Sequence, residues 1–435
     1  MPQAPFQGLK VIDTTQVLAG PYTGYQFAVL GADVIKVENP HDPDFVRSVG
    51  TDAALNDIGM GTQFLTQNSN KRFLALDLKT QEGRNILKRL VADADVFIQN
   101  YRPGSFDDLG IGYKDLSAIN PRLIYCSISA FGQTGPKASY TGYENVIQAA
   151  SGYMSANGTP EVRPLRQGAP AVDYATGITA AFAITAALQQ RERTGTGDHV
   201  DVAMTDVAMI LMACQVTSHF NDGFEPVPTG NTMPLATSSV YPTKDGLLMI
   251  GACNAHQMKS LWTLLGRPDM IKPDHYNSPV ADHDNEAAVL RELMLEKGAS
   301  EWEVLLQTNR VPAARVRERL GDAIADPQFD HRQVFSNNIT VPGLDQSVRV
   351  PLVGFKFADG GATIQSPPGG VGVDTDAVLA ELGYSAQEIS GFRLAGVVGG
   401  QASDEHHSAV SPARQDPTSV SALAASTITS EKERQ

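Results

Sequence analysis

Short apolar runs alternate with amphipathic stretches in the first third of the chain. Leu9–Thr14 and Ala32–Val37 are rich in β-branched residues, as strands are, and Pro21–Leu30 between them has apolar residues at helical spacing. Pro21 suits a first helical position because it has no N–H group, and Gly31 follows the last periodic residue, as glycine often does after a helix. This stretch predicts a strand–helix–strand unit.

The same alternation continues to Ser129. Strands joined through helices run parallel in a sheet, and their crossovers are right-handed. The N-terminal part of the chain is therefore predicted to be an α/β domain with a Rossmann-like parallel sheet. In chain order we expect a strand at Phe73–Leu78, a helix at Gln81–Ala92, a strand at Asp95–Gln99, a helix at Tyr113–Ile119 and a strand at Leu123–Ser129.

Helical spacing then dominates, and Ala169–Arg191 is the longest helical candidate. A strand at His199–Ala203 and a helix at Asp206–His219 follow. Between Gly223 and Pro234 the chain becomes rich in Pro, Gly, Asn and Thr, which is typical of a linker or an active-site loop. We expect a second, smaller unit to begin here.

The smaller unit is predicted to be of the α+β class. Its clearest signal is Asp245-Gly246, a hairpin turn between the apolar runs Ser238–Thr243 and Leu247–Cys253. Helical spacing follows at Gln257–Leu265, Glu286–Glu296 and Trp302–Thr308.

The C-terminal part is expected to complete the large domain. A β pattern returns at Ile339–Phe357, and Asp374–Leu382 is an amphipathic helix. Residues 401–435 contain no aromatic residue and few aliphatic ones, so they cannot bury enough apolar surface to offset the entropy of ordering. The predicted division is 1–222 for the first part of the large domain, 223–335 for the small domain with its linker, 336–400 for the completing segment and 401–435 for a mobile tail.

Composition narrows the classes of partner. The 34 basic and 48 acidic residues give a net charge of −14, which disfavours nucleic acid. No run approaches about 18 consecutive apolar residues, so no membrane span is expected. The N-terminus lacks the features of a secretory signal. Cys126, Cys214 and Cys253 form no CxxC pair, which fits a reduced cytoplasmic location and gives no sign of a metal site.

Familiar catalytic motifs are missing from the sequence. It has no GxxxxGK[ST] phosphate loop, no GxGxxG after the first strand, no HExxH and no GxSxG. ATP-driven ligation, Rossmann-type nicotinamide chemistry, zinc hydrolysis and lipase-like chemistry therefore all lack their usual marker. The chemistry has to be sought in individual residues.

Several short motifs, in their order along the chain, carry a resemblance to the class III coenzyme A transferases, the formyl-CoA transferase type. They extend from Gly8 to Val398. They include Gly8-Leu9-Lys10-Val11-Ile12-Asp13, Val17-Leu18-Ala19-Gly20-Pro21, Leu30-Gly31-Ala32-Asp33, Asn70-Lys71-Arg72, Asn100-Tyr101-Arg102-Pro103-Gly104, Gly142-Tyr143-Glu144-Asn145-Val146, Gly168-Ala169-Pro170-Ala171-Val172-Asp173, Gly195-Thr196-Gly197-Asp198 and Leu382-Gly383-Tyr384.

This resemblance implies a large domain built from both chain ends, a small inserted domain and an interlocked, ring-like homodimer. It implies transfer of coenzyme A from an acyl-CoA to a free carboxylic acid, with coenzyme A as substrate and no permanently bound cofactor. The expected partners are an acyl-CoA, a carboxylic acid and a second copy of the chain.

Asp173 is the expected nucleophile, because it matches the catalytic aspartate of the family. A carboxylate that attacks a thioester forms a mixed anhydride, to which the expelled thiolate can return and give an enzyme-bound thioester. If a helix begins near Asp173, its N-terminal dipole would keep the carboxylate ionised, and nearby N–H groups could stabilise an oxyanion. The alternative is that Asp173 only caps this helix.

Glu144 and Tyr143 match the pair that lies beside the family's catalytic aspartate. Glu144 is expected to orient or screen the acyl-aspartyl intermediate, unless it is a solvated first-turn glutamate. The related α-methylacyl-CoA racemases carry a histidine where this chain has Tyr143, so racemisation would lack its second acid. A racemase or epimerase is the second hypothesis, and a non-catalytic acyl-CoA-binding homologue is the third; Asp173 argues against the latter.

For coenzyme A, the resemblance points to three places in the chain. Basic side chains would meet the phosphates, and an apolar wall would take the adenine. Lys71 and Arg72 are further candidates, with a solvated charge as the alternative for each. The candidate binding residues are Val17, Leu18, Leu76, Lys79, Asn100, Tyr101 and Arg102.

The chain departs from the formyl-CoA transferase pattern at several positions. Leu18 stands where that family has a catalytic glutamine, Asn39 and Asp108 stand where it has arginines, and 230–232 replaces a run of glycines. These changes disfavour formate and predict a larger acid, such as a short dicarboxylate or a branched acid, with succinyl-CoA or acetyl-CoA as donor. Arg163 or Arg166 could pair with a distal carboxylate, or be a surface charge.

Overall fold

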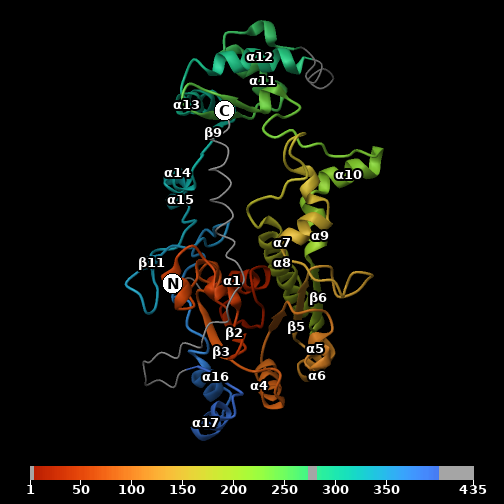
Figure 1. Cartoon of the computed structure of the whole chain (residues 1–435), viewed down its shortest axis with the longest axis vertical. Helices are drawn as coiled ribbons and strands as arrows, with labels where there is room; N and C mark the ends of the chain where they lie inside the picture. The colour runs from red at the N-terminus through yellow and green to blue at the C-terminus, as the bar shows by residue number, and fades with distance from the viewer. Residues whose placement is uncertain (1–3, 273–281, 401–435) are drawn as a thin grey trace, which may run out of the picture. The chain divides into compact units, whose positions relative to one another are not determined.

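The large sheet is parallel throughout. The computed structural model describes residues 4–272 and 282–400, and the predicted tail 401–435 lies outside them. The strand order is β3-β2-β1-β4-β5-β6, and every neighbouring pair is parallel. The α/β class with a parallel sheet is thereby confirmed (Figure 1). Its strands are β1 (Lys10–Asp13), β2 (Asp33–Glu38), β3 (Lys71–Ala75), β4 (Val96–Gln99), β5 (Ile124–Ser129) and β6 (Asp198–Ala203).

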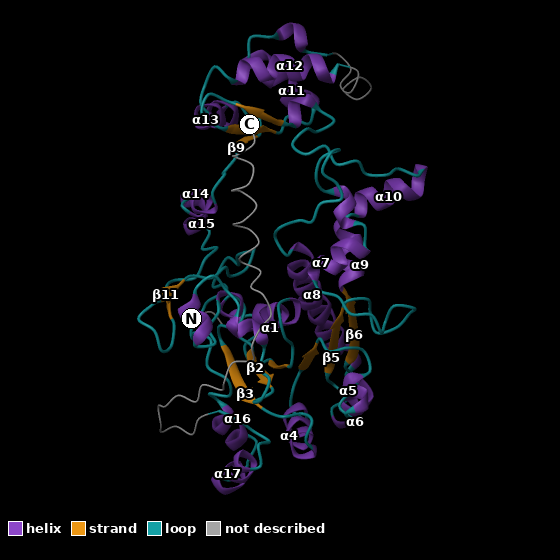
Figure 2. Cartoon of the chain, viewed as in Figure 1, coloured by secondary structure: helices purple, strands orange, loops and turns teal. Residues whose placement is uncertain are grey.

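Helices cover both faces of this sheet (Figure 2), and the residues of β1 to β5 are mostly buried between them, whereas those of β6 are more exposed. On one face Phe27 of α1 and Ile184 of α8 pack against Val11 and Ile98. On the other face Leu87 of α4 packs in the same cluster as Phe97. The helices of the first face are α1 (Ala19–Val29) and α8 (Ala171–Thr194), and those of the second are α4 (Gln81–Val91), α6 (Tyr113–Ile119), α16 (Thr375–Glu381) and α17 (Ala386–Leu394).

Helix α1 begins two residues earlier than predicted. Pro21 is its third residue. Its missing N–H costs no helical hydrogen bond at this position, because the first four N–H groups of a helix have no acceptor within it. Gly31 has a φ of 97°, so the expected glycine at the helix end is confirmed. The predicted helix over Asp206–His219 is interrupted at Met212, giving α9 (Met204–Leu211) and α10 (Ala213–Asp222).

A second, antiparallel sheet forms between residues 240 and 315. The predicted hairpin is confirmed, because β7 (Val240–Pro242) pairs with β8 (Leu247–Ile250). A third strand, β9 (Ala313–Arg315), pairs with β8 and was not predicted from the sequence. Trp262 and Trp302 lie in the buried cluster of this part. Its helices are α11 (Ala255–Leu264), α12 (His283–Met294) and α13 (Ala299–Thr308).

The C-terminal segment returns to the parallel sheet. The N–H of Phe73 in β3 donates to the Asp374 carboxylate at 2.8 Å, and Leu76 forms a bridge with Val398. The β pattern predicted for Ile339–Phe357 yields only the short pair β10 (Ile339–Thr340) and β11 (Ser347–Val348). The remaining short helices are α2 (Ala53–Asp57), α3 (Thr62–Leu65), α5 (Ser105–Asp108), α7 (Glu144–Ala150), α14 (Leu320–Ile324) and α15 (Pro327–His331).

Helix α8 has 24 residues and is long and apolar enough to cross a membrane, judged by length and composition alone. It corresponds to the predicted helix Ala169–Arg191, for which no membrane span was expected. In the fold, Val172, Ala180 and Ile184 are buried, and α8 packs against α1, β5 and β6.

Candidate active site

A cavity of about 300 Å³ lies at the carboxyl ends of β1 and β4. The strand order reverses between these neighbours, and the loops that leave them diverge. In parallel α/β sheets, ligands bind in the crevice that forms at such a point. The lining residues come from the end of β5, from the loops after β1, β4 and β5, and from the starts of α1, α8 and α9: Gln16, Val17, Leu18, Ala19, Asn100, Tyr101, Arg102, Ile128, Ser129, Ala130, Gly142, Tyr143, Asp173 and Met204.

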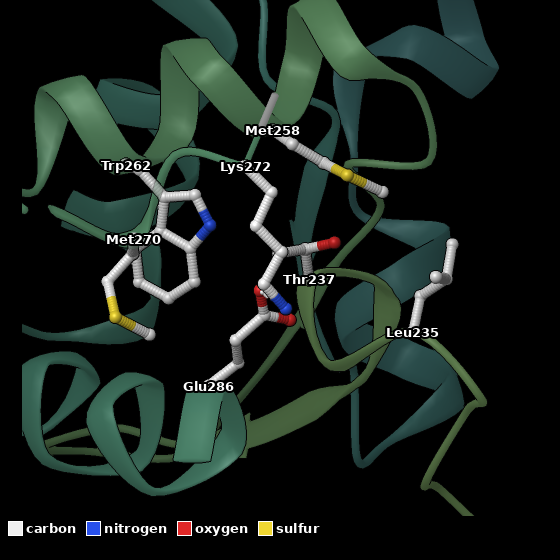
Figure 3. A pocket seen from close by; sticks show the side chains of 7 residues that line it. All are labelled: Leu235, Thr237, Met258, Trp262, Met270, Lys272 and Glu286. Carbon is white, nitrogen blue, oxygen red and sulfur yellow. Dashed lines mark ion pairs between the residues drawn. The ribbon is translucent and has the colours of Figure 1, made fainter. Parts of the chain in front are cut away.

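A second cavity of about 350 Å³ adjoins the first. Asn100, Tyr101, Arg102 and Tyr143 line both cavities, and the second also reaches Tyr140 and Val146. The pair of cavities therefore suits a ligand longer than a small acid. A third pocket, between α11 and α12, measures only about 10 Å³ and contains the ion pair of Lys272 with Glu286 at 2.9 Å (Figure 3). It is too small for a substrate.

Asp173 lies half-buried in the first turn of α8 and lines the first cavity. Its side chain does not cap the helix, since the N-cap residue is Pro170 and no side-chain cap bond is present there. Burial, and then the charge of Glu144, raise the pKa of the Asp173 carboxyl to about 7. These two effects oppose the expectation that the helix N-terminus keeps this carboxylate fully ionised, because both raise its pKa.

Glu144 supplies the cap that α8 lacks. Its Oε2 accepts the backbone N–H of Asp173 at 2.6 Å, and its Oε1 accepts that of Val172 at 3.3 Å. A carboxylate at a helix N-terminus is stabilised both by these N–H groups and by the dipole. Glu144 is thus not a solvated first-turn residue, and it occupies the N–H of Asp173, which was one of the expected oxyanion donors.

Gln148 holds Glu144 in this position, a role that was not predicted from the sequence. Its side chain is buried, and its Nε2 donates to Oε1 of Glu144 at 2.6 Å. Its Oε1 accepts the N–H of Gln167 at 2.9 Å, which fastens the segment before α8 to α7. The spacing of four residues from Glu144 was the available signal, because such pairs are neighbours on a helix.

Tyr143 is the N-cap residue of α7, and its side chain is exposed while lining both cavities. No histidine is among the lining residues within the described part of the chain. Among the described residues, the site therefore offers Asp173 no histidine partner for two-base proton exchange.

Five of the seven predicted coenzyme A residues lie together. Val17, Leu18, Asn100, Tyr101 and Arg102 all line the first cavity, and Arg102 is the only cation there among the residues that the structure describes. The loops after β1 and β4 are tied to each other, because Asn100 accepts the N–H of Gln16 at 2.9 Å and donates to its carbonyl at 2.7 Å.

The other two predicted coenzyme A residues are not among the lining residues. Leu76 is buried directly after β3, and Lys79 is exposed in the turn before α4. Both lie at the same carboxyl edge of the sheet as the cavity.

Lys71 and Arg72 are not solvated charges. Lys71 is fully enclosed and donates to Asp13 at 2.8 Å, and Arg72 pairs with Asp33 at 2.6 Å and Glu381 at 2.8 Å. Burial alone would raise the pKa of Asp13, but Lys71 and Lys36 together hold it below its ordinary value. Lys71, Asp13 and Lys36 form a buried network beneath the β1 loop, whereas Arg72 and its partners are partly exposed.

The two arginines considered for a distal carboxylate lie outside the cavities. Arg163 and Arg166 are both exposed, and Arg166 donates to the carbonyl of Gln167 at 3.0 Å. Neither is among the residues lining either cavity. The described residues contain no group of three or more His, Cys, Asp or Glu side chains that could hold a metal ion.

The comparisons with known proteins agree with this architecture. The family model described as CoA-transferase family III matches residues 6–375. The chain belongs to this family. Succinate--glutarate CoA-transferase of Agrobacterium fabrum is 34% identical over 390 residues, covering 87% of this chain and 96% of that protein. The human succinyl-CoA:glutarate CoA-transferase is 32% identical, with 91% and 90% covered.

Solved structures give the same result for the fold. A CaiB/BaiF family protein from Brucella suis matches with a TM-score of 0.73 and 34% identity, over 87% of this chain and 100% of that one. The Rv3272 protein from Mycobacterium tuberculosis matches with a TM-score of 0.75 and 31% identity, with 87% and 99% covered. The prediction of a CoA-transferase that acts on CoA thioesters is confirmed, ahead of the racemase and binding-protein alternatives.

Proposed function

We propose that Asp173 is the nucleophile through which this CoA-transferase passes coenzyme A from an acyl-CoA to a carboxylic acid. The observation that carries the proposal is the half-buried carboxylate of Asp173 on the cavity wall, beside a second carboxylate that occupies the α8 N-terminus. A carboxylate stripped of water attacks a thioester more readily than a hydrated one. Glu144 takes the N–H groups that would otherwise hold the Asp173 charge.

The chemistry balances without ATP. The Asp173 carboxylate attacks the thioester carbonyl, expels the coenzyme A thiolate and forms a mixed anhydride. The thiolate then attacks the Asp173 carbonyl, so that an aspartyl-CoA thioester forms and the donor acid leaves as a carboxylate. The acceptor carboxylate repeats the two steps in reverse. It forms a new anhydride with Asp173, and the thiolate attacks the acceptor's carbonyl to give the new acyl-CoA and free Asp173.

The surrounding residues have separate tasks in this proposal. Arg102 meets a phosphate of coenzyme A, since it is the one cation that the described part of the chain places on the wall of the first cavity. Val17, Leu18 and Tyr101 contact the pantetheine and adenine parts. Tyr143, exposed between the two cavities, shields the intermediate from water.

For the acids, we propose succinyl-CoA as donor and a short dicarboxylate as acceptor. The support comes from relatives that are named for succinate, glutarate, mesaconate and D-citramalate, and from the apolar Leu18 on the cavity wall, which suits formate poorly. An acetyl-CoA:oxalate CoA-transferase of Acetobacter aceti, 34% identical, is the contrasting relative. A panel of acceptor acids assayed with succinyl-CoA and acetyl-CoA tests the proposal, and a clear preference for formate or oxalate would contradict it.

We further propose that two copies of the chain form an obligate homodimer. Helices α8 to α10 carry large apolar side chains that the single chain leaves open to solvent: Phe182 is 75% exposed, Ile210 73% and Phe220 84%. Apolar patches of this kind mark interfaces.

The kinetic test of covalent transfer is exchange in a half-reaction. Labelled succinate should enter succinyl-CoA in the absence of any acceptor, because the aspartyl-CoA thioester forms and reverts with the donor acid alone. A racemase would instead exchange the α-hydrogen with deuterated water and would not incorporate succinate. Absence of succinate exchange in an enzyme that turns over with an acceptor would contradict the double displacement.

A further inference from the structure

The backbone of Val17 adopts a conformation that its side chain disfavours. Its φ is 74°, in the left-handed region, where a β-branched residue is a genuine outlier. Three other non-glycine residues of the described chain have positive φ, namely Asn70, Arg310 and Gln333, and none of them is β-branched. Such outliers persist only where the surrounding structure determines them, and they concentrate at functional sites.

Both polar groups of the Val17 backbone are held by buried side chains. Its N–H lies 3.2 and 3.3 Å from the two carboxylate oxygens of Asp44, and its carbonyl accepts from Nε2 of Gln67 at 2.5 Å. Asp44 is fully enclosed and receives Nζ of Lys36 at 3.2 Å. Gln67 is also buried. Asp44 and Gln67 thus hydrogen-bond the peptide groups on either side of the Val17 Cα.

The geometry of Val17 decides where the cavity wall lies. Val17 is the second residue before α1, whose first residue, Ala19, lines the cavity together with Val17 and Leu18. A return of Val17 to negative φ would redirect the chain between the Gln16–Asn100 bonds and the start of α1. That change would move the wall on which coenzyme A is expected to rest.

We propose that Gln67 is a positioning residue for coenzyme A, acting with Asp44 to hold Val17 in the left-handed conformation that shapes the cavity. This inference rests on the proposed placement of coenzyme A in the cavity. Gln67 itself is not among the residues that line the cavity, so it acts through Val17 and not by touching the ligand.

A double-mutant cycle on coenzyme A binding tests the inference, with Gln67→Met and Val17→Gly as its two changes. Free coenzyme A is the probe, and isothermal titration gives its dissociation constant without any turnover. In the wild-type background, Gln67→Met should weaken binding roughly tenfold, because the strained conformation loses a hydrogen bond. In the Val17→Gly background, the same change should matter much less, since glycine adopts positive φ freely.

Arg310→Gly is the matched control. Arg310 also has a positive φ, 59°, but it lies after α13 and away from the cavity lining. This change relieves backbone strain elsewhere, so it should not restore coenzyme A binding to Gln67→Met. Rescue by Arg310→Gly as complete as that by Val17→Gly would show a general gain of stability and overturn the inference.

The remaining outcomes are equally decisive. Two results overturn the positioning role and leave the proposed function intact. The first is an equal loss of affinity from Gln67→Met in both Val17 backgrounds. The second is no loss of affinity in Gln67→Met while Arg102→Ala binds coenzyme A weakly. Unchanged affinity in both Gln67→Met and Arg102→Ala removes coenzyme A from the cavity, and the inference falls with the proposed function. If Gln67→Met folds only together with Val17→Gly, the coupling is shown directly; if neither the single nor the double variant folds, it is refuted.

Discussion

The backbone N–H of Asp173 donates to the Glu144 carboxylate at 2.6 Å, while the Asp173 side chain lies beside the same negative charge. One neighbour therefore orders the start of α8 and opposes ionisation of the residue proposed to attack. Burial and this charge bring the pKa of Asp173 to about 7. Glu144 therefore helps to set the fraction of Asp173 that is ionised, and so able to attack, at neutral pH.

The pH dependence of transfer should report this pair. Only ionised Asp173 can attack, so kcat/KM for the acyl-CoA should fall as the pH drops through about 7. Glu144→Gln removes the like charge but keeps an oxygen for the helix N–H groups, so it should lower the pKa of Asp173 and move the midpoint to lower pH. The pH profile of kcat/KM for both proteins checks this. An unmoved midpoint would show that Glu144 does not set the ionisation of the reacting group.

Asp173→Asn should abolish transfer and stabilise the fold. The folded-state pKa, about 7, lies above the ordinary value of 3.8, so the wild type loses stability as the pH rises from about 4 to about 7. An amide carries no such penalty. We expect the free energy of unfolding at pH 8 to exceed that of the wild type by about 1–2 kcal/mol, with the full shift discounted for partial exposure. The gain should disappear below about pH 4. Denaturant titrations at both pH values measure it, and a less stable variant at pH 8 would contradict the account.

Lys71→Met should destabilise the chain strongly. It leaves Asp13 buried without its 2.8 Å partner, and loss of one member of a buried pair costs about 3–5 kcal/mol. Lys79→Met is the control, because Lys79 is exposed and has no such partner in the described structure. Chemical denaturation of the two variants compares them. Equal stability of Lys71→Met and wild type would show that the buried network does not support the β1 loop.

Phe182→Glu should disrupt assembly. The side chain is 75% exposed on α8 in the single chain, and a buried charge at a dimer interface would oppose association. Leu394→Glu is the control, since Leu394 is exposed on α17, which packs on the opposite face of the sheet. Analytical ultracentrifugation gives the outcome. A wild-type protein that is a stable folded monomer at low concentration would overturn the homodimer, whatever the variants do.

The sequence predicted the sheet well because its strands are buried on both faces. The strand Ile124–Ser129, for example, is buried along almost its whole length and stands between two predicted helices, so the type and order of these elements could be predicted from the sequence. The two small antiparallel sheets were harder to predict from the sequence. The strand β9 is only three residues long and takes its partner from a hairpin about 65 residues earlier, a relationship that no local pattern contains.

The site was predicted only through the resemblance to a family. Spacing alone would have made Asp173 a helix cap, and nothing local shows that Glu144, from another helix, performs that task. The hydrogen bond from Gln67 to the Val17 carbonyl connects two loops whose residues are 50 positions apart in the sequence. Such contacts depend on tertiary packing, so they become visible only when the chain is folded.

The most direct test of the central claim is to trap the enzyme-bound thioester. The protein is mixed with succinyl-CoA, quenched with hydroxylamine and digested, and the peptides are analysed by mass spectrometry. The account predicts a hydroxamate on Asp173, formed only when succinyl-CoA is present and absent from Asp173→Asn and from protein treated with free coenzyme A. A hydroxamate on another carboxylate, or none on Asp173 in a preparation that is turning over, would contradict it.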